Sequence, residues 1–166
     1  MKKLLLFFVL FICMQSFTEP VPNSYGQTVF EAFQSKNLQS IGMVPIDKLQ
    51  GLLQIIEPQE TPENIQKLYP EYRKGIQQNK EYLSDLLTEG EQQGIEWSTI
   101  TLEGIEVVDM PDSIFNVSNM VLHRSIEVTI SSKEQQFVIK IVNAIRYDGN
   151  WYLGGNSVGG LILEKI

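Results

Sequence analysis

The chain has 166 residues, with 20 acidic against 13 basic side chains and a formal net charge of −7 at pH 7. A negative chain without a basic cluster repels phosphate backbones and anionic lipid, so we expect neither nucleic acid nor a membrane surface among its partners. One histidine and one cysteine are too few for an ordinary transition-metal site or a disulfide framework, and we expect no metal and no cofactor.

The N-terminus is typical of an export signal. Lys2 and Lys3 precede an unbroken apolar run over residues 4–14. That run is shorter than the roughly 20 residues that a membrane-spanning helix needs, so it predicts a secretory leader and not an anchor. The protein is therefore expected to be secreted or periplasmic.

Two ends for this leader are considered. The best small-residue cleavage site is Ser24-Tyr25-Gly26, which makes residues 1–26 the signal peptide and residues 27–166 a single domain without cysteine. In the alternative, Cys13 is lipidated and the protein is an anchored lipoprotein. Ile12 argues against that alternative, because a lipobox has a small residue at this position.

The first half of the mature chain has the apolar periodicity of helices. Four helical segments are expected from capping and proline signals, starting near Thr28, Pro45, Thr61 and Glu71. Thr28 and Glu31 match a capping box, and Pro70 separates the last two segments because its ring does not fit inside a continuous helix. The last helix is expected to stop near Gly90 or Gly94.

In the second half the apolar period changes to two, which is typical of strands. Ile100 and Leu102 fall on one face, whereas Ile105 and Val107 have the opposite parity. A single bulge at Glu103-Gly104 would return all four side chains to the same face.

The remaining strands have clear alternation. The inward side chains expected from it are Leu122, Ile126, Val128 and Ile130, then Phe137, Ile139, Ile141, Ile145 and Tyr147 in one row. Asp148-Gly149 predicts a hairpin turn. We expect a three-residue loop over 147–149 that pairs Ile145 with Trp151, because this register hides on the order of 200 Å² more apolar surface.

Helices followed by antiparallel strands indicate an α+β fold, with N-terminal helices packed on a curved antiparallel sheet of about four strands. The ending FVIKIVNAIRYDGNWYLGG resembles the closing hairpin of the nuclear-transport-factor-2-like (cystatin-like) superfamily, where a strand turns at Asp-Gly and a tryptophan re-enters the core. The resemblance covers about residues 28–158 as architecture and implies a cone with a pocket. It implies no particular function, because the superfamily includes isomerases, hydrolases, transport adaptors and exported bacterial domains without known activity.

No catalytic motif emerges from the sequence. His123, the only histidine, shares the polar face of its strand and is expected at the surface. The glycine-rich segment 154–160 lacks the Lys-Ser/Thr of a phosphate loop. It is expected to end the sheet and to let residues 161–166 fold back.

Asn143 and Tyr147 are the candidate ligand-binding residues. Asn143 interrupts an apolar row, and a buried amide must find a partner. It therefore lines the cavity of the cone, bonds to a helix-end carbonyl, or marks a point where the strand reaches solvent. Tyr147 is expected near the rim. The sequence therefore predicts an exported non-catalytic domain that binds a small molecule or a protein partner. The alternatives are a cone-pocket enzyme of the isomerase or hydrolase type, with Asp109 and Tyr147 as conceivable members of its site, and a tethered lipoprotein module.

Overall fold

The computed structural model describes residues 22–108, 122–154 and 160–166. Its elements are α2 (Pro22–Gln34), η1 (Leu38–Ser40), α3 (Ile46–Ile56), α4 (Pro62–Lys67), α5 (Tyr69–Gln92), η2 (Trp97–Thr99), β1 (Thr101–Val108), β2 (Leu122–Ser132), β3 (Gln135–Tyr147), β4 (Asn150–Leu153) and β5 (Leu161–Lys165). The helices precede the strands, and the strands form one antiparallel sheet. The predicted α+β class is confirmed.

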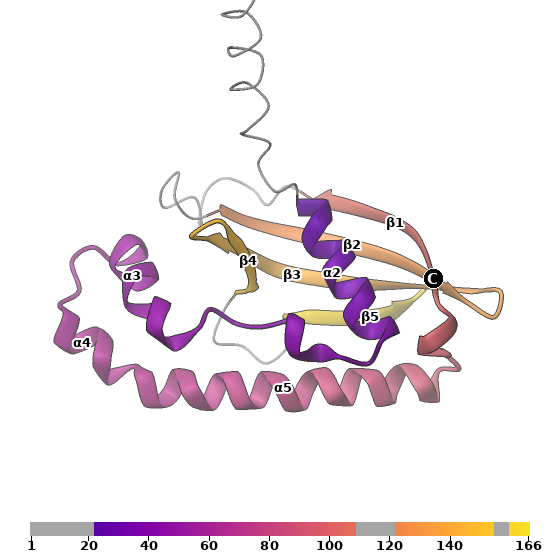
Figure 1. The fold of residues 1–166 in the computed structure, drawn as a ribbon, viewed down its shortest axis with the longest axis horizontal. Coiled ribbons are helices and arrows are strands. Elements are labelled where there is room, and N and C mark those ends of the chain that lie inside the picture. The colour runs from indigo at the N-terminus through magenta and orange to yellow at the C-terminus, as the bar shows by residue number, and fades with distance from the viewer. Residues whose placement is uncertain (1–21, 109–121, 155–159) are drawn as a thin grey trace, which may run out of the picture.

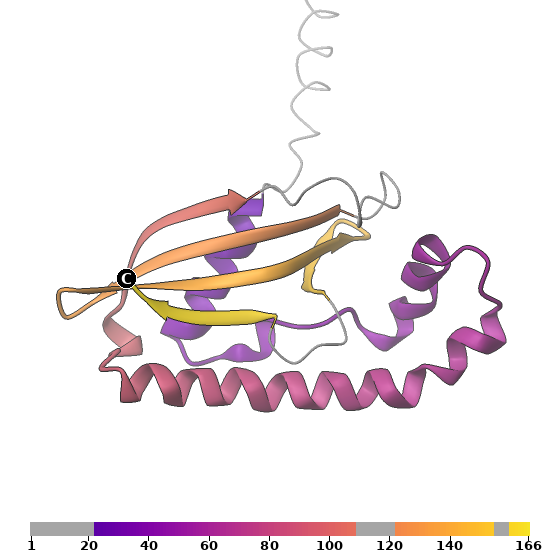
Figure 2. The same cartoon turned by 180° about the vertical axis from the view of Figure 1, so that it is seen from behind.

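The helices cover one face and one margin of the sheet. α2 lies across one face (Figure 1), and none of the described helices covers the opposite face (Figure 2). α5 runs along the margin formed by β5, where the Tyr82 hydroxyl donates to the Leu161 carbonyl at 2.7 Å. α3 and α4 lie beyond the end of the sheet that carries the β3–β4 hairpin.

Two of the predicted helix starts are confirmed with their chemistry. Pro45 is the N-terminal flanking residue of α3, and the Thr61 hydroxyl caps α4 by accepting from the Asn64 backbone N–H at 3.3 Å. Pro62 and Pro70 occupy the first turns of α4 and α5. A missing N–H costs nothing there, because those groups have no partner within the helix.

The predicted start of the first helix is wrong. α2 begins at Pro22, and the Thr28 hydroxyl donates to the Ser24 carbonyl at 3.0 Å inside the helix, so Thr28 does not cap it. The helix extends toward the N-terminus because Tyr25 is buried in the main core.

The sheet has the order β1-β2-β3, and two short strands share the free edge of β3. β5 pairs with residues 137–141 of β3, and β4 pairs with residues 144–147. The fifth strand is the C-terminal segment that was expected to fold back. In β1 the register shifts between Leu102 and Gly104, which confirms the predicted bulge.

A second bulge, in β3, was not predicted. Ile126 of β2 pairs with Ile141, whereas Arg124 pairs with Ala144, so β3 contains one extra residue at positions 142–143. Ile141 and Ala144 both belong to the main core, but Ile145 belongs to a second cluster formed with α3. The predicted single row from Phe137 to Tyr147 is therefore wrong, because the extra residue reverses the parity.

The hairpin register also differs from the prediction. Tyr147 pairs with Asn150 and Arg146 pairs with Trp151, so the loop has two residues, Asp148 and Gly149. Both have positive φ, at 50° and 74°, which is the backbone of the type I′ turn favoured in two-residue hairpins. The predicted pairing of Ile145 with Trp151 is wrong, because the bulge had already moved Ile145 to the other face.

The core is anchored by Trp97 of η2, which is 1% exposed. Its indole N–H donates to the Leu87 carbonyl at 2.9 Å, and its ring lies 5.0 Å from the ring of Phe33. The indole passes directly over Gly90 of α5, where a side chain would overlap it. Trp97 therefore closes the core between α2, α5 and the sheet.

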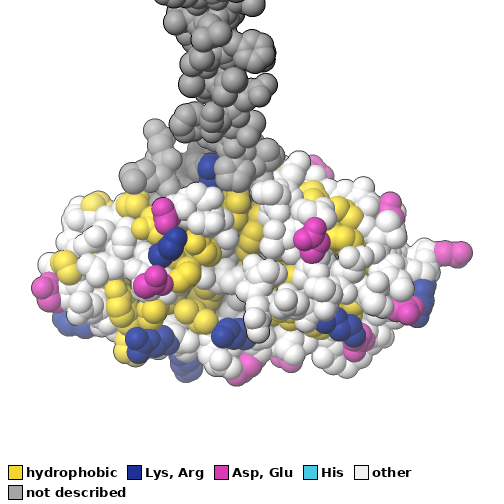
Figure 3. Space-filling view, viewed as in Figure 1, with side chains coloured by type: hydrophobic (Ala, Val, Ile, Leu, Met, Phe, Trp, Pro, Cys, Tyr) yellow, Lys and Arg dark blue, Asp and Glu magenta, His cyan; other side chains and the backbone are white. Residues whose placement is uncertain are grey.

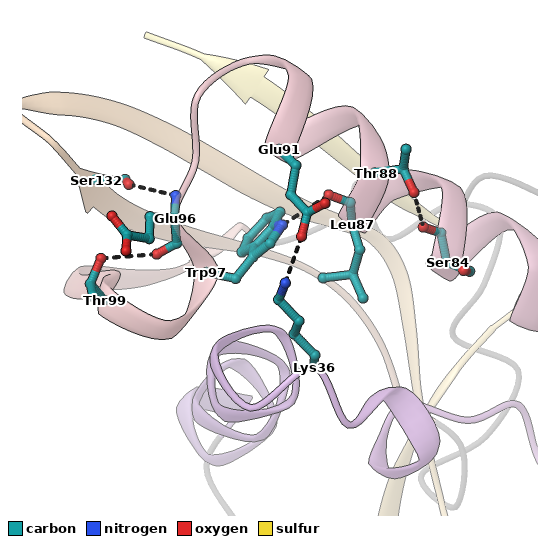
Figure 4. A network of polar contacts seen from close by, with 9 residues as sticks. All are labelled: Lys36, Ser84, Leu87, Thr88, Glu91, Glu96, Trp97, Thr99 and Ser132. Atoms are coloured by element: carbon teal, nitrogen blue, oxygen red, sulfur yellow. Dashed lines mark hydrogen bonds and ion pairs between the residues drawn. The ribbon is translucent and has the colours of Figure 1, made fainter.

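Polar contacts surround this end of the core (Figure 4). The Lys36 ammonium pairs with the Glu91 carboxylate at 2.6 Å and joins the turn after α2 to α5. The Glu96 backbone N–H donates to the buried Ser132 hydroxyl at 3.0 Å, and the Thr99 hydroxyl donates to the Glu96 carbonyl at 3.1 Å. The first of these two bonds holds the η2 turn to β2, and the second closes the turn itself.

Candidate functional site

An open cleft of about 250 Å³ lies between α2, η1 and the β3–β4 hairpin. Its lining comprises Ser24, Tyr25 and Thr28 of α2, Ser40 of η1, and Gly149, Asn150 and Trp151 of the hairpin. The space-filling view shows apolar side chains gathered toward the half of this face that carries α3, α4 and the β3–β4 hairpin, with Lys and Arg mainly along the lower margin (Figure 3).

Two aromatic rings form the apolar part of the cleft. Tyr25 is 4% exposed, and its ring stacks on that of Trp151 with centroids 6.4 Å apart and planes 19° apart. Trp151 is half-buried, so part of its indole is accessible from the cleft. The hairpin that carries Trp151 is tied to α3 by an ion pair between Lys48 and Asp148 at 2.5 Å.

The Tyr25 hydroxyl lacks a hydrogen-bond partner. Among the described residues it is the one buried side-chain polar atom in this condition. Burial raises the pKa of Tyr25 well above its usual value, so the group stays a neutral donor. An unpaired buried hydroxyl costs about 1–3 kcal/mol of stability.

The polar part of the cleft is uncharged. Ser24, Thr28 and Ser40 contribute hydroxyls, and Asn150 contributes an amide, although its N–H₂ group also donates to the Asp148 carbonyl at 2.9 Å. The described lining contains no Asp, Glu, His, Lys or Arg. Such a site can donate and accept hydrogen bonds and cover an apolar surface, but its groups do not titrate near neutral pH.

The structure places Asn143 and Tyr147 away from this cleft. Asn143 lies at the β3 bulge, where its carbonyl accepts from the Gly154 N–H at 2.7 Å and its side chain lies against Gly154. Tyr147 packs against Gly51 of α3 in the second cluster. The two residues therefore border the junction of β3, β4 and α3.

Asp109 and Cys13 lie outside the described residues. The backbone of His123 pairs with Ile145 in the ladder between β2 and β3, and its side chain is also outside the described part.

Sequence reasoning missed the α2 side of the cleft, because Ser24 and Tyr25 fell inside the expected leader. A signal for Tyr25 was present. Tyr25, Val29 and Phe33 recur at the i, i+4, i+8 spacing of a helix face, and all three are buried. This stripe extends the helix one turn before Thr28.

In the described part of the chain, no helix is long and apolar enough to cross a bilayer, and no group of three or more His, Cys, Asp or Glu could hold a metal ion. Comparisons with protein-family models, with curated proteins and with solved structures find no match for this chain.

Proposed function

We propose that this protein is an exported binding domain of the nuclear-transport-factor-2-like type, and that it holds a small, neutral, hydroxylated ligand in the cleft beside Tyr25 and Trp151. The apolar leader supports export, and helices on one face of a bulged antiparallel sheet support the fold type. The observation that carries the proposal is the cleft itself, where an accessible indole adjoins uncharged hydroxyl and amide groups.

The chemistry of the lining favours a single sugar-like ring. Such a ring has an apolar C–H face, which an indole covers well, and hydroxyls that both donate and accept. The cleft of about 250 Å³ is slightly smaller than the usual site for a drug-sized ligand, which begins at roughly 300 Å³. Its size therefore suits one ring and not an extended cofactor.

The lining favours binding over turnover. General acid–base catalysis needs a group that titrates near the working pH, usually a carboxylate or histidine moved by burial. Among the described residues, no Asp, Glu or His side chain is buried, and none lines the cleft. A protein partner that inserts a neutral side chain into the cleft is the second candidate for the occupant, because the cleft is open to solvent.

The proposal is tested by NMR titration of the full chain with glucose, with N-acetylglucosamine and with a neutral Ser/Gly/Asn-rich peptide. We expect saturable shifts of the Trp151 indole N–H and of the Asn150 side-chain amide with one of the sugars, in the millimolar range. The Trp97 indole N–H is the internal control, since Trp97 is buried and its neighbour Glu96 bonds to Ser132, at the end of the sheet opposite the β3–β4 hairpin.

Two serine variants provide a matched control. Ser40→Ala removes a hydroxyl from the cleft, whereas Ser98→Ala removes an exposed hydroxyl from η2. We expect several-fold weaker sugar binding for Ser40→Ala and none of this loss for Ser98→Ala. If only the peptide causes shifts, the occupant of the cleft is a protein partner and not a sugar-like ligand. If Trp151 responds to none of the probes, the proposed site is wrong.

A further inference from the structure

The residues directly before Gln27 are part of the folded domain. The first five residues of α2 include Tyr25, which is 4% exposed, and Gly26, which lies against β1. A methyl group added at Gly26 would come within 2.7 Å of the Ile105 side chain, so helix and strand are in close contact there. The Ser24 carbonyl accepts the Thr28 hydroxyl at 3.0 Å and secures the turn from within.

A cut after Gly26 would remove this turn from the mature protein. The domain would lose the ring that stacks on Trp151 and would expose apolar core that Tyr25 now covers. The new ammonium group at Gln27 would also stand at the N-terminus of the shortened helix. A positive charge is unfavourable there, because the helix dipole already places partial positive charge at that end.

We propose that the leader is cut between Thr18 and Glu19, so that the mature protein keeps the whole of α2. The inference rests on the proposed export. Ser16 and Thr18 supply small side chains at positions −3 and −1. This site follows the apolar run over 4–14 closely, whereas Gly26 is separated from it by a long polar stretch.

The reaction is hydrolysis of one peptide bond by water in a leader peptidase of the exporting cell. The Thr18–Glu19 amide bond breaks, Thr18 gains the new carboxyl group, and Glu19 gains the new amino group. The mature chain then has three residues, 19–21, before α2 begins at Pro22. Ser24 and Tyr25 remain in the cleft.

The test is the intact mass and N-terminal sequence of the protein secreted by a bacterium that expresses the full chain. We expect Glu19 as the N-terminal residue. An N-terminus at Gln27, or a diacylated Cys13, would overturn the assignment. A chain that keeps Met1 would overturn both the cut and the proposed export, while the ligand titration would still test the cleft on its own.

Two leucine substitutions distinguish the competing sites, because each blocks position −3 of one of them. Ser16→Leu should leave the precursor unprocessed if the cut follows Thr18. Ser24→Leu changes an exposed position of α2 and should leave processing as in the parent. The opposite result, with Ser24→Leu unprocessed and Ser16→Leu normal, would assign the cut to Gly26.

Discussion

The two tryptophans lie at opposite ends of the sheet and are held in different ways. Trp97 is 1% exposed, donates its N–H to the Leu87 carbonyl and covers Gly90 of α5. Trp151 is half-buried and stacks on Tyr25, whose hydroxyl has no partner among the described residues. One end of the core is thus closed and hydrogen-bonded, and the other is open to solvent.

In this small domain, one end of the core contributes mainly to stability, and the other end is available for binding. A fully packed, fully hydrogen-bonded indole stabilises the folded state and leaves no accessible surface or free N–H for a ligand. A half-exposed indole beside an unpaired hydroxyl contributes less to folding and keeps surface for recognition. The Trp97 end of the core is therefore the structural anchor, and the Trp151 end is the candidate site.

The largest expected effect is on the closed end. Trp97→Ala should lower the free energy of unfolding by about 3–5 kcal/mol, the usual cost of removing a buried aromatic side chain. Trp151→Ala should lower it by only about 1–3 kcal/mol, because the half-buried ring leaves less apolar area to expose. Urea unfolding of both variants measures the difference. Equal losses would contradict the distinction between the two ends.

The contact between Gly90 and Trp97 predicts the next effect. Gly90→Ala should destabilise the protein by about 1–3 kcal/mol, because the added methyl group overlaps the indole and forces it to move. Gly75→Ala, in the same helix, is the matched control, since the nearest atom to an added methyl group there is the Met43 methyl carbon, 4.0 Å away. That change should stabilise the protein by about 0.4–1 kcal/mol through helix propensity. A stabilising Gly90→Ala would show that the indole is not tightly packed.

A pair of tyrosine variants tests whether the open end holds an unpaired hydroxyl. Tyr72→Phe should cost about 0.5–1.5 kcal/mol, because the Tyr72 hydroxyl donates to the Val44 carbonyl at 2.9 Å. Tyr25→Phe should leave stability unchanged or raise it by up to about 1 kcal/mol, because it removes a buried group without a partner. Chemical unfolding under identical conditions measures both. A loss in Tyr25→Phe as large as that in Tyr72→Phe would mean that the Tyr25 hydroxyl is bonded in solution.

The smallest effect is expected at the surface of the closed end. Lys36 and Glu91 form an ion pair at 2.6 Å, but their side chains are 52% and 50% exposed. Lys36→Ala should therefore cost no more than about 1 kcal/mol, and the loss should shrink further at high salt. Stability measured at low and high ionic strength checks this. A larger, salt-independent loss would indicate that the Lys36 stem contributes by packing.

Local signals in the sequence determined much of this fold. Pro45 and Thr61 mark helix starts by backbone geometry and capping, and both act within a few residues along the chain. The β1 bulge was readable because the apolar residues on its two sides have opposite parity. Asp148-Gly149 marked the turn, since both positions adopt the positive φ that a tight hairpin requires.

Tertiary packing decided the remainder, including the candidate site. The β3 bulge left no parity signal, because Ala144 and Ile145 are both apolar and either could face the main core. Its position coincides with the junction at which β5 gives way to β4 along the same edge, and this arrangement depends on residues far apart in the chain. The helical stripe of α2 indicates that Tyr25 is buried, but its stacking partner Trp151 lies more than a hundred residues away, and no local pattern encodes that contact. The cleft arises from that same long-range meeting of α2 with the hairpin.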